Sequence, residues 1–254
     1  MRNMAFIMLT LIFTITMKPV YTTKTDIIRI GLLMPEKSYI FSWDLMEPVF
    51  DIALDSIHSL YPAFQYKTYY ENDKCSEYLA PAKAVELYFK YQVNVFFGPV
   101  CSYPAAPVAR FTTYWKIPLL TPGALVDAFD VKLGLGSMYS SMTRVSGSYG
   151  HLGLFFEQIF KYFEWKPRNH SNVDIFVQQS QDTLGRGKSE EYFVCSGIFK
   201  RLSSVGLKST PRIFPEYANR DILRKNLSDF LSLSKRNARS MHFDFICTNK
   251  YADV

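Results

Sequence analysis

The sequence predicts an α/β fold with two lobes, each built on a parallel β-sheet flanked by helices. Short apolar runs alternate with longer stretches whose apolar residues recur every three or four positions. This alternation is typical of βαβ units, which have parallel strands and right-handed crossovers. The pattern becomes irregular over residues 127–148 and then starts again. We therefore expect a first lobe over residues 23–145 and a second over residues 146–254, which breaks off after a strand and is incomplete.

The first lobe is predicted to alternate strands with helices from its start. The best-defined helix contains Leu45, Val49 and Ile52 on one stripe, with Pro48 in or near the first turn, where its missing N–H is tolerated. Residues 138–145 could add a strand that borders a crossover. The predicted strands are 26–34, 64–70, 93–98 and 117–120, and the predicted helices are 45–60, 76–91 and 104–115.

The second lobe is predicted to repeat this alternation. A strongly apolar helix opens it, and a short strand over residues 212–214 has the weakest pattern. The predicted helices are 149–165, 189–206 and 219–233, and the remaining strands are 173–179 and 242–248.

Residues 1–22 are predicted to be a secretory signal peptide. Arg2 precedes an apolar run from Met4 to Met17, which is short for a membrane-spanning helix, although an uncleaved anchor is the alternative. Cleavage would lower the formal net charge from +6 to +4. No later stretch of 18 apolar residues exists. We expect an extracellular protein that does not bind nucleic acid, with glycosylation acceptors at Asn169 and Asn226.

Four cysteines suit two disulfides on a fold that has its own core. Cys75 follows the second predicted strand and Cys101 follows the third. If those strands are parallel neighbours, about 4.8 Å apart, both cysteines reach the same edge of the sheet. A disulfide needs Cα atoms about 4.4–6.8 Å apart. A Cys75–Cys101 bond is therefore predicted, and two free thiols are the alternative.

The stretch GPVCSYPAAPVARFTTYWKIPLLTPGA, residues 98–124, closely resembles the first-lobe loop of natriuretic peptide receptors, which include receptor-type guanylate cyclases. MEPVFDIAL and CSEYLAPAKAVELYF match that family in order and spacing, and later matches are looser. The resemblance implies a type I periplasmic-binding-protein fold that forms homodimers and binds a peptide hormone between protomers. The family's transmembrane, kinase-homology and cyclase parts are absent from this chain, so we expect no enzymatic activity and membrane attachment only in a full-length form.

The resemblance also implies five ligand contacts, which are Glu77, Tyr103, Arg110, Tyr192 and Phe193. Arginine offers five donors to peptide carbonyl or carboxylate oxygens, and tyrosine offers contact area at a small entropy cost. Without the resemblance, Tyr103 could equally pack within its loop and Arg110 could pair with an acid.

The second half departs from the family pattern. Glu191 stands where the family often has a cysteine, and Cys195 follows one helical turn later, so a bond to Cys247 is implied with a shifted position. Ser196 replaces a family glutamate that contacts hormone, so the ligand need not be a natriuretic peptide. The resemblance further implies chloride binding by the N–H groups of Val100 and Cys101.

Other functions have weaker support in the sequence. The four histidines lack the spacing of metal ligands, so no metal is predicted. GRGKS at residues 185–189 lacks the first glycine of a phosphate-binding loop. Two rivals stay open, namely a receptor for a small molecule such as an amino acid and a secreted decoy or truncated isoform. An α/β enzyme is a third and weaker rival.

Overall fold

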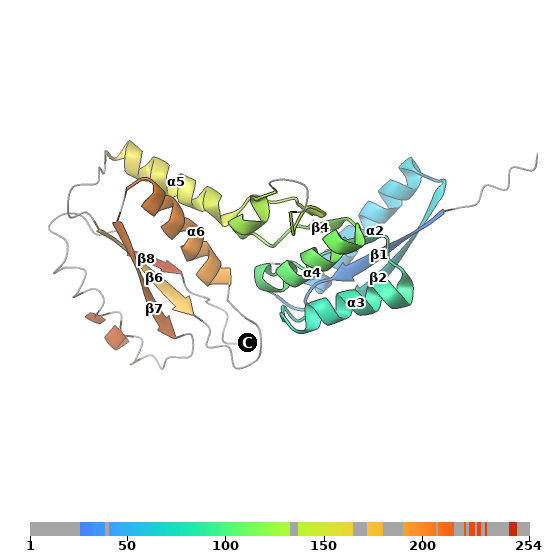
Figure 1. Cartoon of the computed structure of the whole chain (residues 1–254), viewed down its shortest axis with the longest axis horizontal. Helices are drawn as coiled ribbons and strands as arrows, with labels where there is room; N and C mark the ends of the chain where they lie inside the picture. Colours follow the sequence, from blue (N-terminus) through green and yellow to red (C-terminus); the bar gives the residue numbers. More distant parts are fainter. Residues whose placement is uncertain are drawn as a thin grey trace, which may run out of the picture.

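The computed structural model describes residues 26–38, 41–132, 137–164, 172–179, 190–206 and 208–215, with shorter pieces between residues 221 and 247. The described strands form two parallel sheets flanked by helices, one in each half of the chain (Figure 1). The predicted fold class is confirmed. The signal-peptide prediction lies outside the described residues. Among the residues that are described, no helix is both long and apolar enough to cross a membrane.

The first sheet has the strand order β2-β1-β3-β4-β5, and all its described pairs are parallel. Strand β1 therefore lies between β2 and β3. The strands are β1 (Asp26–Leu33), β2 (Phe64–Glu71), β3 (Val95–Phe97), β4 (Leu119–Thr121) and β5 (Met142–Arg144). The helices are α2 (Trp43–Leu60), α3 (Leu79–Tyr91) and α4 (Ser102–Trp115), and a 3-10 turn, η1, covers Asp127–Asp130.

Strand alternation divides the core of this lobe between the two faces of the sheet. Leu33 packs in a cluster with Ala84 of α3 and Val108 of α4. Leu32, its neighbour, packs in a second cluster with Phe50 of α2. Because successive side chains of a strand point to opposite faces, α2 covers one face while α3 and α4 cover the other.

The connection from β3 to α4 depends on a glycine. Gly98 has φ +79°, and a Cβ atom on it would lie 1.7 Å from the carbonyl oxygen of Leu33. A side chain is excluded there, and the chain can turn sharply toward Cys101 and the start of α4. The helix begins at Ser102, two residues before the predicted start, since Pro104 fits within the first turn.

The second sheet has the order β7-β6-β8, again with parallel pairs. Ile175 of β6 packs in a cluster with Ile198 of α6 and Phe160 of α5. The elements are α5 (Tyr149–Tyr162), β6 (Asn172–Gln179), α6 (Glu190–Ser204), β7 (Lys208–Pro215) and β8 (Asp244–Cys247). The predicted three-residue strand at 212–214 is thus an eight-residue strand, and the helix predicted over 219–233 falls only partly within the described residues.

The chain passes from one sheet to the other between β5 and α5, and this crossing is tied to the first lobe. The N–H of Val145 donates to the carbonyl of Thr121 at 3.1 Å, and the N–H of Tyr149 donates to the carbonyl of Leu125 at 2.8 Å. The start of α5 is therefore fixed to the loop that follows β4.

Candidate functional site

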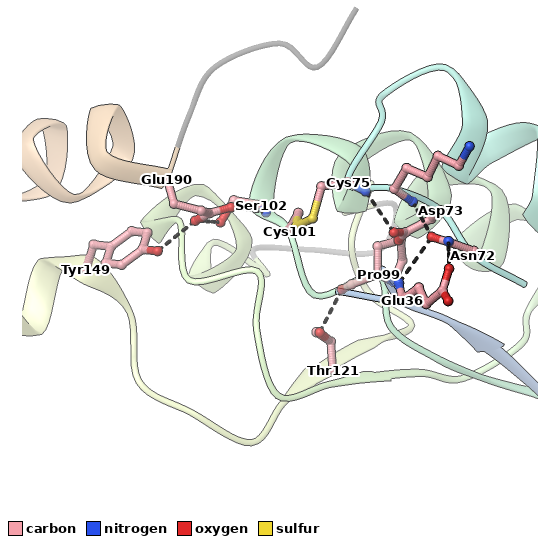
Figure 2. Close-up of a disulfide and its surroundings, with 11 residues drawn as sticks. Glu36, Asn72, Asp73, Cys75, Pro99, Cys101, Ser102, Thr121, Tyr149 and Glu190 are labelled. Atoms are coloured by element: carbon pink, nitrogen blue, oxygen red, sulfur yellow. Dashed lines mark hydrogen bonds between the residues drawn. A yellow bond between two sulfur atoms is a disulfide. The ribbon is translucent and has the colours of Figure 1, made fainter. Parts of the chain in front are cut away.

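The carboxyl ends of β2 and β3 are joined by a disulfide between Cys75 and Cys101, as Figure 2 shows. The two Cα atoms lie 5.5 Å apart. β1 separates β2 from β3 in the sheet, so the loop after β2 must reach across the end of β1. The predicted bond is therefore present, but the two strands are not the direct neighbours that the prediction assumed.

Asp73 organises the loop that carries Cys75. Its Oδ1 accepts a hydrogen bond from the N–H of Cys75 at 2.9 Å (Figure 2). The side chain is fully buried, and within the described part of the chain its Oδ2 has no hydrogen-bond partner. Burial raises the pKa of Asp73 to about 6, against the smaller lowering effect of the Cys75 N–H. Asp73 is therefore a carboxyl group that is costly to ionise, and it lies beside the disulfide at the rim of the first lobe.

A cavity of about 450 Å³ opens beside this rim, between the first lobe and α6. Four of the five residues implied as ligand contacts line it, namely Glu77, Tyr103, Arg110 and Phe193. The first three come from the first lobe, and Phe193 comes from α6. The other lining residues are Ser102, Ala106, Pro107, Val126, Ala128, Phe129 and Tyr139.

Aromatic rings line this cavity. The rings of Tyr103 and Phe193 are stacked across the two lobes, with centroids 6.3 Å apart. Arg110 is exposed, donates from Nη2 to the hydroxyl of Tyr139 at 3.2 Å, and holds its guanidinium carbon 5.8 Å from the ring centroid. Tyr139 in turn meets Phe129 edge-on. Arg110 is thus oriented by an aromatic neighbour while its other donors can reach a ligand.

Tyr192 is the member of the predicted set that does not line the cavity. It is half-buried and packs against the core cluster of the second lobe. Its ring also contacts that of the neighbouring Phe193, with centroids 5.6 Å apart. Tyr192 therefore supports the wall that Phe193 presents.

One carboxylate joins the two lobes next to the cavity. Glu190, the first residue of α6, accepts hydrogen bonds from Ser102 at the start of α4 and from Tyr149 at the start of α5 (Figure 2). Burial raises the pKa of Glu190, and the hydrogen bonds from Tyr149 and Ser102 act in the opposite direction.

The remaining predicted sites have less structural context. Cys195 is 1% exposed and disulfide-bonded, while the side chain of Cys247 lies outside the described residues, so their pairing stays a prediction. Asn169 also lies outside, and Asn226 is half-buried in a helical segment. The described residues contain no cluster of three or more His, Cys, Asp or Glu that could hold a metal.

Chloride binding at Val100 and Cys101 also stays a prediction. Val100 is buried, and its carbonyl accepts the N–H of Ala124 at 2.7 Å. The N–H of Ser102, which follows Cys101, already donates to Glu190.

Sequence reasoning missed Tyr139 and Glu190. Tyr139 lies in the irregular stretch before β5, where no periodicity marks it. An acidic residue in the first turn is common in exposed helices, because it complements the helix dipole, so Glu190 carried no distinctive signal.

Comparison with known proteins finds a matching family model and similar receptors. Residues 45–168 match the sequence model of the receptor family ligand binding region. Atrial natriuretic peptide receptor 2 of Bos taurus is 28% identical over 190 residues, which cover 74% of this chain and 17% of that protein. Atrial natriuretic peptide receptor 3 of Homo sapiens is 28% identical over 211 residues, which cover 77% of this chain and 36% of that protein.

The predicted resemblance to natriuretic peptide receptors is confirmed. The similarity concerns a ligand-binding region. The chain spans about a sixth of the receptor 2 protein and about a third of the receptor 3 protein that it matches.

Solved structures show the same fold. A periplasmic binding protein from Burkholderia mallei aligns with a TM-score of 0.60 and 13% identity, covering 80% of this chain and 51% of that one. A leucine binding protein from Thermotoga maritima aligns with a TM-score of 0.57 and 14% identity, covering 81% and 53%. A solute binding protein from Rhodopseudomonas palustris in complex with p-hydroxybenzoic acid aligns with a TM-score of 0.56 and 15% identity, covering 87% and 54%. These identities establish the architecture and leave the ligand open.

Proposed function

We propose that this chain is the extracellular ligand-binding region of a natriuretic-peptide-receptor-like protein and that it binds a peptide hormone in the cavity between the lobes. Signalling would pass through receptor parts outside this chain. The observation that carries the proposal is that Glu77, Tyr103, Arg110 and Phe193, which come from three separate segments, line one cavity. The names of the matched receptors support a natriuretic peptide as the first ligand to test.

The chemistry of the cavity suits part of a peptide. Its volume, about 450 Å³, is within the range of small-ligand pockets and would admit one or two side chains rather than a whole hormone. The stacked rings of Tyr103 and Phe193 offer an apolar surface, and Arg110 offers donors to a backbone carbonyl or carboxylate. Glu77 could accept from a basic side chain. The rest of the hormone would lie outside the cavity.

The small-molecule alternative gains support from the solved structures, whose complexes include p-hydroxybenzoic acid and leucine. A small carboxylic acid would need hydroxyl and N–H groups aimed at its carboxylate. Such a pair exists here, in the Oγ and N–H of Ser102, but both already bond to Glu190. We therefore favour the peptide. The decoy alternative has the same cavity, and it differs only in producing no signal once the ligand is bound.

We further propose that the chain acts as a homodimer through the outer surface of α3 and α4. Phe89 is 72% exposed and Tyr114 is 84% exposed, and Phe111 adds to the same helix pair. The two helices pack together on one face of the first sheet (Figure 1). Large exposed aromatic residues are enriched at protein–protein interfaces. Tyr114→Asp should weaken dimerisation in analytical ultracentrifugation by about tenfold or more, whereas Tyr61→Asp, beyond α2, should not.

The decisive test of the binding site is Arg110→Ala. Removing the guanidinium should weaken binding of synthetic atrial natriuretic peptide by about tenfold or more, because arginine is often a hot-spot residue of binding interfaces. Thermal unfolding should be nearly unchanged, since Arg110 is exposed. Lys116→Ala is the matched control, because Lys116 is an exposed cation just beyond the same helix. Equal affinity of the Arg110→Ala variant and the wild type would reject the site.

A further inference from the structure

Glu190 makes an unusually complete set of contacts for a residue at a helix start. Its Oε1 accepts the N–H of Ser102 at 2.5 Å. Its Oε2 accepts the hydroxyl of Ser102 at 2.7 Å and the hydroxyl of Tyr149 at 2.6 Å. The partners lie 88 and 41 residues away in the sequence. Three donors from two other helices therefore converge on one carboxylate (Figure 2).

The donors form a buried site of their own. Ser102 is 1% exposed and Tyr149 is 6% exposed. Ser102 is the first residue of α4, and the N–H groups at a helix start carry partial positive charge and have no partner within the helix. A carboxylate at this place is stabilised by the helix and by two hydroxyl groups.

The part of the second lobe that Glu190 holds is packed as one body. A Cβ atom on Gly197 would lie 3.0 Å from the backbone of Tyr149, and a Cβ atom on Gly153 would lie 2.6 Å from the side chain of Arg201. The absence of side chains at these glycines lets α5 and α6 pack closely. Arg201 of α6 also pairs with the buried Glu157 of α5 at 2.6 Å. A contact at the start of α6 thus fixes both helices.

This contact also determines where one wall of the cavity lies. Phe193 follows Glu190 by three residues, which is nearly one turn of α6, so both side chains project from the same side of the helix. Tyr103 follows Ser102 directly. The Glu190–Ser102 contact therefore brings Phe193 to the ring of Tyr103, with centroids 6.3 Å apart.

We propose that Glu190 is an internal ligand: its carboxylate fills a carboxylate-binding site formed by Ser102 and Tyr149, and this positions Phe193 against Tyr103 before any hormone arrives. Glu190 is a positioning residue, because it acts on the cavity through α6. The consequence for the cavity rests on the proposed function, whereas the internal carboxylate site does not.

The test is chemical rescue of Glu190→Ala. The exchange rate of the Ser102 amide proton is measured by NMR on the full chain. The rate should rise by at least about tenfold in the variant, because a hydrogen bond to a charged acceptor is lost. Added sodium acetate should restore most of the protection by supplying the missing carboxylate. Sodium perchlorate at the same ionic strength is the control, because its anion coordinates weakly, and it should restore little.

Two further variants keep the test decisive if Glu190→Ala folds poorly. Glu190→Gln keeps an acceptor for the Ser102 N–H and should retain most of its protection. Tyr149→Phe keeps the ring but removes one donor, and it should raise the exchange rate by a smaller factor than Glu190→Ala. An unchanged Ser102 exchange rate in all three variants, or equal rescue by acetate and perchlorate, would overturn the internal site. Because this readout needs no hormone, failure of peptide binding would leave it unaffected.

Discussion

The two sides of the cavity are held in place by different means. On the first-lobe side, Glu77 follows Cys75 by two residues, and Tyr103 follows Cys101 by two residues, so a disulfide joins their two loops at the edge of a five-stranded sheet. On the second-lobe side, Phe193 depends on α6, whose start reaches the first lobe through Glu190. One side is fixed by a covalent bond and the other by hydrogen bonds.

This difference separates stability from positioning. The disulfide closes a loop of the first lobe, so we expect its removal mainly to lower the free energy of unfolding. Glu190 joins two lobes that each have their own hydrophobic core. We therefore expect a change at Glu190 mainly to alter the position of one lobe relative to the other. A ligand that spans both sides would gain most from a second side that is already in position.

The largest expected effect tests the covalent side. The double variant Cys75→Ser/Cys101→Ser should lower the free energy of unfolding by about 3.5 kcal/mol, since the bond closes a loop with a sequence separation of 26 residues. Urea unfolding under non-reducing conditions measures the loss. Glu190→Gln is the comparison variant, and it should lose clearly less stability. A double variant that unfolds at the wild-type urea concentration would show that the first-lobe side does not depend on the disulfide.

Much of the fold and part of the site could be predicted from the sequence, because they depend on local pattern. Strand–helix alternation predicted both parallel sheets, and the family resemblance indicated four of the residues that line the cavity. The Cys75–Cys101 bond was predicted from the positions of the strand ends, although β1 lies between the two strands.

The interlobe contact could not be predicted in this way. Ser102 and Glu190 meet across 88 residues, and their distance depends on how α5 and α6 pack against each other and on where the crossing attaches to the first lobe. Neither the packing of the two helices nor the attachment of the crossing produces a hydrophobic periodicity or a sequence motif. Tyr139 is similar, since its place beside Arg110 depends on the irregular chain between η1 and β5.

The smaller effect concerns the buried acid beside the disulfide, and it distinguishes Asp73 from Glu190. Both carboxyl groups have a pKa raised mainly by burial, but Glu190 has three donors, whereas Asp73 shows one for Oδ1 and none for Oδ2 within the described chain. Because the pKa of Asp73 rises from 3.8 to about 6 on folding, its contribution favours the folded state at low pH and is lost as the pH rises through 6.

Asp73→Asn should therefore remove a cost that grows as the pH rises from about 4 to about 6 and remains at higher pH. The amide keeps an acceptor for the Cys75 N–H and carries no charge. The unfolding free energy of the variant relative to the wild type should increase by up to about 3 kcal/mol between pH 4 and pH 8. Asp51→Asn, at an exposed position on α2, should show little such change. If the free energy of unfolding depended on pH in the same way for Asp73→Asn and the wild type, Asp73 would be ionised at little cost. The loop that carries Cys75 would then fold without an electrostatic penalty.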